Sequence, residues 1–556
     1  MYRRTRIILI LLLVCSQAYS QLRYTNPVLA GFYPDPSICR VGDDYYLVNS
    51  SFSYFPGLPV FHSKDLVNWR QIGNAMDRNS QLQLGNGGVS RGLFAPTLRY
   101  HNGLYYIMCT NVSQGGNFII TAKNPAGPWS DPVFTPNASG IDPSLFFDDD
   151  GKVYITYNSE APDNKPLYDG HRTIRLIEYD IRQMKAVGVN KILVNGGTNL
   201  DEKPIWIEGP HLYKINGWYY LMCAQGGTGF NHTEVIFRSK KVDGPYVSYK
   251  GNPILSQVTL DKNRKDPVTS TGHADLVETP DGKWYAVFLG CRPYDNDYYN
   301  TGRETFLAPV KWKDGWPVIL DPDLALPYTF PVPSDTIKKV YNPFSGNYTF
   351  RDDFDKAVLD NRFLMLRNPT AGLYTIKDGQ LHLPLKKITA SGDGNPAFIG
   401  FRQAHLKGTA TVSMDFSANK ENEKAGIMIF QSEHAFYYLC KSIKDRKPVV
   451  SLYKSGSTPD QDMTLLAQAP LSQSRSLQLR IVANGADYGF QYAQKQNQWV
   501  TLKSGVDGKF LSTNEAGGFV GCLYALYATS LGEETRLSAA YNWFEYKGSD
   551  EAYKLQ

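Results

Sequence analysis

A strand signal that recurs five times in the first 320 residues constrains the fold of this chain more than any other feature. Each copy has a turn rich in Gly, Asp or Asn, followed by an aromatic strand; the copies read VGDDYYLVNSS, HNGLYYIMCTN, DDGKVYITYNS, INGWYYLMCAQ and PDGKWYAVFLG. A second short strand precedes each turn, and these strands open at Asp35, Ala95, Asp142, Gly209 and His273. The openings are 47 to 67 residues apart, which suits a four-stranded blade with variable loops. The repeat therefore predicts a five-bladed β-propeller over residues 21–320.

The first strand of each blade would line the central axis, so its start would face a funnel at one end of that axis. Asp35 and Asp142 open their strands at equivalent positions, two blades apart. In the fourth repeat Gly209 takes the aligned position and Glu208 comes directly before it, and the fifth repeat places His273 there. We therefore expect three carboxylates and one imidazole around a single funnel.

The pattern changes after Trp316. The segment LDPDLALPYTFPVPSD is rich in Pro and lacks alternation, which predicts a linker over residues 321–347. From about Tyr348, eleven short alternating segments follow at close spacing, which predicts an antiparallel β-sandwich over residues 348–548. Aromatic residues make up 13% of the chain, and Gly (48) and Pro (33) are plentiful, so an all-β fold is favoured throughout.

The start of the chain, MYRRTRIILILLLVCSQAYSQ, is typical of a secretory signal peptide over residues 1–20. It has a basic beginning, an apolar stretch too short to span a bilayer, and small residues before Gln21. Cys15 raises a lipoprotein alternative, but Val14 stands where a small residue is expected. No later segment is apolar enough to span a membrane. We expect a soluble exported protein, periplasmic or secreted.

Net charge and the number and spacing of the cysteines limit the classes of partner and of metal site that this chain could have. The net charge is +5, from 58 basic and 53 acidic residues, and no long Lys/Arg cluster follows the N-terminus, so a nucleic-acid partner is not indicated. Six cysteines remain after the signal; Cys109, Cys223 and Cys291 lie at or near the ends of apolar strands. We favour small buried residues over disulfides for them, and none has metal-site spacing.

Carboxylates around one funnel suit glycoside hydrolysis, in which one acid protonates the leaving oxygen and a second activates water or attacks the sugar. A third carboxylate disfavours ionisation of its neighbour and keeps that acid protonated near neutral pH. A single Asp before Pro is more often a turn residue, but two at repeat-equivalent positions with Glu208 beside a third favour a site. His273 is either catalytic or an axial residue bonded to water or an ion.

Four stretches carry a resemblance: the N-terminal NPVLAGFYPDPSICRVGDDYYLVNSS, GIDPSLFFDDDGKVY, IEGPHLYK and TGRETF. Together they resemble glycoside hydrolase family 43, and most closely its two-domain β-xylosidase and α-L-arabinofuranosidase branch. RDDFD and FIGFRQAH also resemble that branch's second, concanavalin-like domain, so the likeness covers nearly all of the mature chain.

The resemblance implies a role for each acid. Asp35 would be the general base, Glu208 the general acid, and Asp142 would raise the pKa of Glu208 and orient it. The family inverts the anomeric configuration, which fits a base and an acid about 6.5–9.5 Å apart with water between them. Arg303 in GRETF would reach the sugar; the alternative is a salt bridge with Glu304.

The resemblance also suggests ligands and sugar-facing aromatics. His273 would help to hold a structural ion or water at the channel centre, with calcium as the candidate ion and no cofactor required for the chemistry. Phe52 resembles the family's sugar-facing aromatic, although packing within a blade explains it as well. Phe94 stands where β-xylosidases of this branch often have Trp, which favours terminal arabinofuranosyl substrates. Trp206 either lines the cavity or fills a blade.

The leading hypothesis is an exo-acting, inverting pentosidase that releases α-L-arabinofuranosyl or β-D-xylosyl units from hemicellulose oligosaccharides such as arabinoxylan or xyloglucan fragments. The sandwich would close one side of the funnel; carbohydrate binding by that domain is the less favoured role. Alternatives are a β-D-xylosidase acting mainly on xylo-oligosaccharides and a non-catalytic glycan-binding propeller, although the presence of all three acids argues against the second. A retaining fructosidase would carry a WMNDPNG-like start, which is absent, and endo-arabinanases commonly lack the sandwich.

Overall fold

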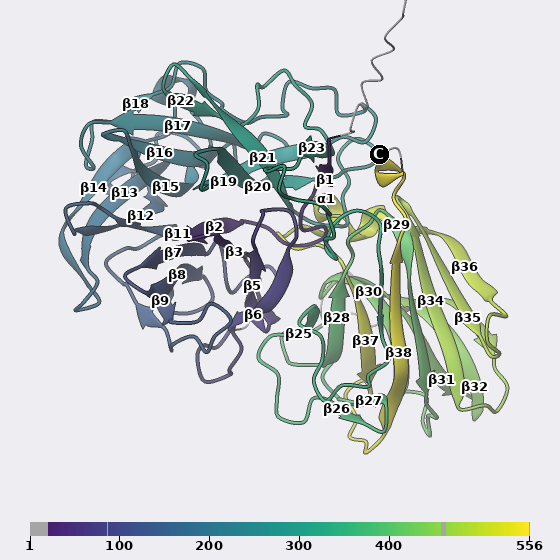
Figure 1. Ribbon diagram of the computed structural model, residues 1–556. Helices are drawn as coiled ribbons and strands as arrows, with labels where there is room; N and C mark the ends of the chain where they lie inside the picture. Colours follow the sequence, from purple (N-terminus) through teal and green to yellow (C-terminus); the bar gives the residue numbers. More distant parts are fainter. Residues whose placement is uncertain (1–20, 86, 457–462, 555–556) are drawn as a thin grey trace, which may run out of the picture.

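The computed structural model describes residues 21–85, 87–456 and 463–554. Five four-stranded antiparallel sheets form a ring, and two eight-stranded sheets follow it (Figure 1). The predicted all-β fold, a five-bladed propeller followed by a concanavalin-like sandwich, is confirmed. The predicted signal peptide and Cys15 lie outside the described residues.

Each blade runs from the axis outwards in chain order. Blades one to three consist of β2 (Ser37–Val41), β3 (Asp44–Val48), β5 (Gly57–Ser63) and β6 (Arg70–Met76); β7 (Thr97–His101), β8 (Leu104–Asn111), β9 (Gly116–Ala122) and β10 (Val133–Phe134); and β11 (Ile141–Phe147), β12 (Val153–Glu160), β13 (Arg172–Asp180) and β14 (Lys185–Asn195). Blades four and five consist of β15 (Glu208–Ile215), β16 (Trp218–Gln225), β17 (Thr233–Ser239) and β18 (Val247–Ser248); and β19 (Thr269–Glu278), β20 (Trp284–Cys291), β21 (Glu304–Lys313) and β22 (Trp316–Val318). The inner strands contact their neighbours around the ring, and β19 beside β2 closes it.

The aromatic second strands of the repeat are buried on both faces because each blade packs between two others. In β16, Leu221 and Cys223 belong to the core shared with blade three, while Tyr220 and Met222 belong to the core shared with blade five. Alternate side chains of one strand thus enter different cores, so the strand is apolar on both faces.

The N-terminal segment pairs with the segment that follows blade five and bonds to blade five itself, which the sequence did not predict. β1 (Arg23–Thr25) pairs with β23 (Thr329–Pro331), which lies inside the segment 321–347 expected to be a linker without strands. The side-chain amide of Asn26 donates to the carbonyl oxygen of Leu307 in blade five at 2.8 Å. Two extended segments therefore satisfy each other's backbone groups, and neither has the alternation that marks a strand.

The sandwich has one sheet in the order β26-β27-β38-β29-β34-β35-β36, with β24 also on β38, and a second in the order β33-β32-β31-β30-β37-β28-β25-β4. Its strands are β24 (Thr349–Asp352), β25 (Phe363–Leu366), β26 (Thr375–Lys377), β27 (Gln380–Pro384), β28 (Ala397–Arg402), β29 (Lys407–Asp415), β30 (Lys424–Ser432), β31 (Ala435–Lys444), β32 (Lys447–Lys454), β33 (Thr464–Pro470), β34 (Ser476–Asn484), β35 (Asp487–Ala493), β36 (Val500–Asp507), β37 (Leu523–Thr529) and β38 (Ser538–Gly548). The helical segments of the described chain are η1 (Pro162–Asn164), η2 (Leu200–Glu202), η3 (Lys509–Leu511), α1 (Thr513–Ala516) and η4 (Glu551–Tyr553).

Three sandwich strands, β25, β33 and β36, were not among the predicted segments. β33 and β36 are edge strands and are largely exposed on both faces, so they lack an apolar alternation. β25 is only four residues long and pairs with β4 (Tyr54–Phe55), a strand from the propeller's first blade. A propeller strand therefore completes the sandwich sheet and holds the two domains together.

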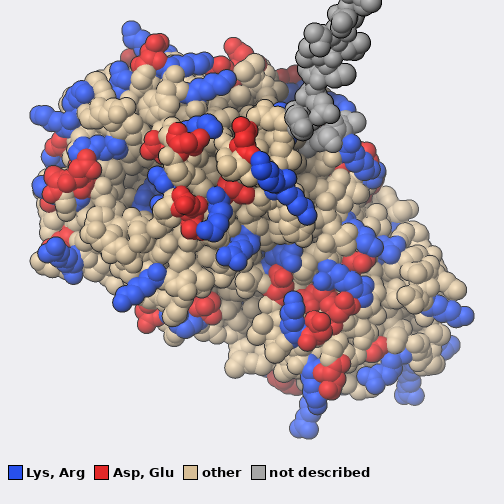
Figure 2. Space-filling view, viewed as in Figure 1, with Lys and Arg blue, Asp and Glu red and all other residues tan. Residues whose placement is uncertain are grey.

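The distribution of surface charge, the state of the cysteines and the hydropathy of the helices can each be compared with the expectations from the sequence. On the face in Figure 2, basic and acidic side chains are interspersed rather than separated. The six cysteines of the described residues are free thiols, and all but Cys39 are buried. Within the described ranges, no helix has the length and hydropathy needed to cross a membrane.

Candidate active site

The inner strands of four blades open with a left-handed residue at the repeat position. Asp35, Asp142, Gly209 and His273 have φ angles of 51°, 51°, 56° and 52°. The register of blades three, four and five shifts at this point, so strict alternation is interrupted. In blade three the repeat residue Asp142 and the residue before it, Ile141, both line the funnel, and in blade four the residue before the repeat position, Glu208, lines it. The interrupted alternation is consistent with Glu208, one position out of alignment, reaching the same space as the two aspartates.

A cavity of about 260 Å³ occupies the funnel. All eight residues that the sequence analysis proposed for the site line this cavity: Asp35, Phe52, Phe94, Asp142, Trp206, Glu208, His273 and Arg303. Six further residues complete the lining: Ala95, Ile141, Ile205, Gly227, Thr228 and Phe519. The structure thus brings the three carboxylates into one cavity.

Asp35 is buried and held on both oxygens. Its Oδ1 accepts a hydrogen bond from Nη1 of Arg303 at 2.7 Å, and its Oδ2 accepts one from the hydroxyl of Ser50 at 2.6 Å. Burial raises the pKa of Asp35, but Arg303, His273 and the Ser50 hydroxyl outweigh it and leave that pKa below its usual range. The alternative partner of Arg303 is excluded, since Glu304 pairs with Arg292 at 2.6 Å. Asp35 is therefore a carboxylate, an acceptor for a proton.

The pKa values of Glu208 and Asp142 are raised, in contrast to the lowered pKa of Asp35. Burial, followed by the charges of Asp142 and Asp35, raises the pKa of Glu208 well above its usual value. Burial also raises the pKa of Asp142 to about 6, although His273 and the backbone N–H of Gly209 oppose the rise. The Oε1 atom of Glu208 has no hydrogen-bond partner among the described residues. Glu208 is therefore a protonated acid at neutral pH.

Three phenylalanines form a wall on one side of the cavity. The rings of Phe52 and Phe94 lie 5.1 Å apart, and Phe519 stacks on Phe52 at 6.1 Å and meets Phe94 edge-on at 5.9 Å. Phe519 comes from the second domain, and its backbone N–H donates to the hydroxyl of Ser90 in the propeller at 2.9 Å. Sequence reasoning missed Phe519, because neither a repeat nor a motif marks a residue delivered by another domain.

Trp206 faces the cavity rather than a blade core. Its backbone is left-handed (φ 55°), its ring is partly buried, and the guanidinium of Arg172 lies 4.7 Å from the ring centre. The cation holds one face of the indole and leaves the remainder to the cavity.

His273 closes the cavity at the axis. Its Nδ1 lies 3.9 Å from Oδ1 of Asp35, and its ring packs against Gly209, where an added Cβ would come within 3.0 Å of the imidazole. Among the described residues, no group of three or more His, Cys, Asp or Glu side chains is arranged to hold a metal ion. Calcium takes six to eight oxygen ligands, so the side chains around His273 do not fit a calcium site made by the protein alone.

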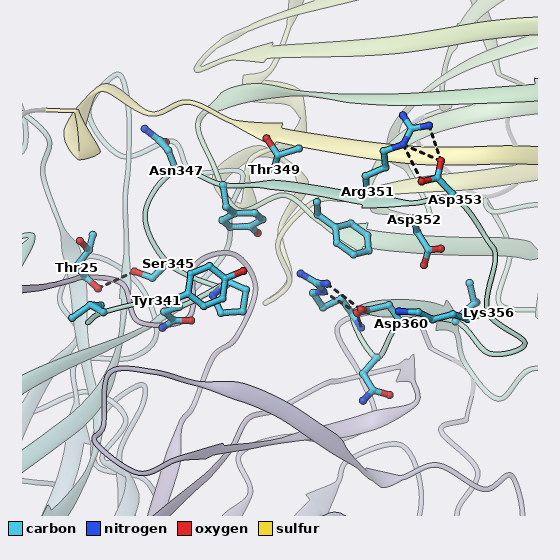
Figure 3. Close-up of a pocket in the computed structure, with 18 of the residues that line it drawn as sticks. Thr25, Tyr341, Ser345, Asn347, Thr349, Arg351, Asp352, Asp353, Lys356 and Asp360 are labelled. Atoms are coloured by element: carbon cyan, nitrogen blue, oxygen red, sulfur yellow. Dashed lines mark hydrogen bonds and ion pairs between the residues drawn. The ribbon is translucent and has the colours of Figure 1, made fainter. Parts of the chain in front are cut away.

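A larger groove lies elsewhere, between the N-terminal segment, residues 340–349 and the start of the sandwich (Figure 3). It has a volume of about 1010 Å³. Two of its arginines pair with aspartates: Arg351 with Asp353 at 2.7 Å, and Arg362 with Asp360 at 2.8 Å. Burial raises the pKa of Asp352, which also lines this groove. The carboxylates that the repeat aligns line the funnel and not this groove, so we assign the acid–base chemistry to the funnel.

Comparisons with known proteins agree with this geometry. Residues 24–317 match the family described as Glycosyl hydrolases family 43, and residues 351–547 match a domain described as Beta xylosidase C-terminal Concanavalin A-like domain. The chain is 42% identical to a "Xylosidase/arabinosidase" of Butyrivibrio fibrisolvens over 93% of this chain and 98% of that one. It is 37% identical to the "Non-reducing end alpha-L-arabinofuranosidase BoGH43B" of Bacteroides ovatus over 98% and 99%. A solved "GH43_12 retrieved from capybara gut metagenome" superimposes with a TM-score of 0.86 and 39% identity, over 92% of this chain and 96% of that one.

Proposed function

The chain belongs to glycosyl hydrolase family 43, and within that family we propose that it is an exo-acting, inverting enzyme that releases non-reducing terminal α-L-arabinofuranosyl units from hemicellulose oligosaccharides. Arabinoxylan and xyloglucan fragments are the proposed sources. The observation that carries the proposal is the pairing of an ionised Asp35 with a protonated Glu208 in one cavity.

In the proposed mechanism Asp35 is the base and Glu208 the acid. Asp35 takes a proton from a water molecule as the water oxygen attacks the anomeric carbon, and Glu208 gives its proton to the glycosidic oxygen as the bond to the sugar breaks. Arg303 keeps Asp35 ionised, and the charge of Asp142 keeps the proton on Glu208. The water adds on the face opposite the leaving group, so the product has inverted configuration.

Two features support a terminal pentose. The cavity of about 260 Å³ is smaller than the usual ligand pocket of about 300–1,000 Å³ and suits one small sugar. Phe519 from the sandwich closes one side, so a chain does not pass through the funnel in both directions.

Phe94 and the relatives' names favour arabinofuranoside as the pentose. Trp, common at the position of Phe94 in β-xylosidases of this branch, would offer a wider stacking surface. The name of the Bacteroides ovatus relative specifies arabinofuranosidase activity, and that of the Butyrivibrio relative includes xylosidase activity, so β-D-xylosyl release is the second candidate. Export through the N-terminal signal, to the periplasm or the medium, is part of the proposal.

The test compares leaving groups. Glu208→Ala is expected to lose about 10²–10⁴-fold in kcat/KM on arabinose-substituted oligosaccharides and much less on an aryl arabinofuranoside with an activated leaving group, because the latter needs little protonation. Equal losses on both substrates would contradict the assignment of the acid. Rates of the unchanged enzyme on aryl arabinofuranoside and aryl xyloside rank the two pentoses, and no turnover of either would favour a glycan-binding propeller. Proton NMR of the first product checks the inversion.

A further inference from the structure

A second cavity, of about 440 Å³, lies at the outer rim of blade four on the same end of the propeller as the funnel. It is enclosed by the strands β16 and β17 and by the loops before β15 and after β18; its lining includes Thr198, Gln225, Asn231, Thr233, Pro253 and Val258. We call it the blade-four cavity. None of the catalytic groups described above faces it.

A low wall separates the blade-four cavity from the funnel. Ile205 lines both cavities and is 51% exposed, although its backbone is fixed by a hydrogen bond from Gly226 N–H to its carbonyl oxygen at 2.8 Å. Gly226 lines the blade-four cavity and Gly227 the funnel. An added Cβ on Gly226 would lie 2.0 Å from the carbonyl oxygen of Asn231, so the tight turn requires glycine there and keeps this part of the wall free of side chains.

The position of the acid indicates which way the substrate leaves the funnel. The general acid protonates the oxygen that joins the terminal sugar to the remainder of the chain, so that remainder lies on the side of Glu208. Glu208 begins β15 of blade four, whereas the wall of Phe52, Phe94 and Phe519 is contributed by other parts of the chain. Ile205 lies three residues before Glu208 and lines both cavities, so we assign the low wall at Ile205 as the exit for the leaving group.

The lining suits a neutral glycan. Ile205, Pro253 and Val258 provide aliphatic surface for the C–H faces of a sugar. The side-chain amide of Asn231 has no hydrogen-bond partner within the described ranges, and it faces this cavity as a donor and acceptor for hydroxyl groups. Glu202 is the lone charged residue among those that line the cavity in the described chain.

We propose that the blade-four cavity binds the leaving-group portion of a neutral hemicellulose oligosaccharide whose terminal pentose occupies the funnel. This rests on the proposed function and deepens it: the enzyme selects for the backbone that carries the pentose, and it does so on a single blade. Small aryl leaving groups remain at the mouth of the funnel and do not extend across Ile205.

Val258→Trp fills the cavity and tests the proposal. We expect kcat/KM on an arabinose-substituted xylo-oligosaccharide to fall about tenfold, mainly through KM, because bound contacts are lost rather than chemistry. On 4-nitrophenyl α-L-arabinofuranoside kcat/KM should stay within about twofold. Val247→Trp is the matched control, since Val247 lies on β18 of the same blade, is 63% exposed and lines neither cavity; it should change neither rate.

Equal losses on both substrates for Val258→Trp, or no loss on either, would overturn the proposal. Failure of the proposed function is a different result, in which the unchanged enzyme turns over neither substrate. If circular dichroism shows that Val258→Trp does not fold, Asn231→Ala replaces it. The expected result is then about a threefold rise in KM for the oligosaccharide alone, and an unchanged KM would overturn the proposal.

Discussion

Two regions of the propeller axis contain buried carboxylates, and they differ in charge balance. Further along the inner strands from the funnel, Asp275 accepts hydrogen bonds from the hydroxyls of Ser37 and Tyr213, both at 2.6 Å, and from Nη1 of Arg99 at 2.8 Å. Burial raises the pKa of Asp275, but Arg99 and these donors hold it well below the usual range. Burial lowers the pKa of the neighbouring His211 to about 3, so one anion faces one cation here.

The funnel has three carboxylates and one arginine. Arg303 neutralises Asp35, and no second cation in the described chain pairs with Asp142 or Glu208. The surplus of negative charge is relieved by a proton, which Glu208 holds because its pKa is raised. A balanced set of charges thus stabilises one part of the axis, whereas the unbalanced set in the funnel keeps a proton on Glu208, which the proposed mechanism uses.

The largest effect is expected from the base. Asp35→Asn keeps the size of the side chain but cannot take a proton from water, so kcat/KM should fall about 10³–10⁴-fold on aryl and natural substrates alike. Steady-state kinetics on both substrate types checks this. A variant that kept a tenth of the activity would show that another group activates water.

Asp275→Asn tests the balanced region and should act on stability. It leaves the buried charge of Arg99 without its counterion, so the free energy of unfolding should fall by about 3–5 kcal/mol, while turnover per folded molecule stays within about threefold. Chemical denaturation and active-site titration measure the two quantities. The double variant Asp275→Asn, Arg99→Met should recover part of the lost free energy of unfolding. If Asp275→Asn instead lost turnover and kept its stability, the region around Asp275 would not be a purely stabilising one.

Asp142→Asn reduces the charge surplus in the funnel and should shift the pH profile. The charge of Asp142 raises the pKa of Glu208, so its removal lowers that pKa. Glu208 acts when protonated, and activity is lost as pH rises through its pKa; the alkaline limb of kcat/KM should therefore move to lower pH. We also expect about a tenfold lower rate at neutral pH. If the alkaline limb stayed in place, Asp142 would not control the pKa of Glu208.

Phe519→Ala should have the smallest effect on kcat/KM, because it alters an uncharged wall of the funnel. In the described chain, the region around Asp275 has no such wall. KM for the terminal pentose should rise about threefold with little change in kcat, since Phe519 lines the cavity but has no acid or base group to take part in the reaction. Phe519 is 37% exposed, so the melting temperature should change little. Phe134→Ala in β10, where the ring is 39% exposed, is the matched control and should leave KM unchanged.

Much of the site could be predicted because blades repeat. The start of each inner strand recurs in the sequence as a short motif, which predicts that Asp35, Asp142 and His273 lie close together; all three line one cavity. Glu208 was harder to align, because only the left-handed turn at Gly209 shows why a residue out of register faces the same cavity. The resemblance implies the separate roles of base and acid, and the lowered pKa of Asp35 and the raised pKa of Glu208 support that proposal.

The blade pattern, the change to a sandwich and the candidate acids can all be read from the sequence, because alternation, turn residues and short motifs are local properties of the chain. Four other features depend on the folded chain: Arg303 neutralises Asp35, Phe519 and Ser50 reach the site, β4 joins the sandwich, and β23 pairs with β1. These contacts join residues far apart in the chain. Burial and mutual distance then set the charges of three otherwise similar carboxylates, and neither quantity exists until the ring has closed.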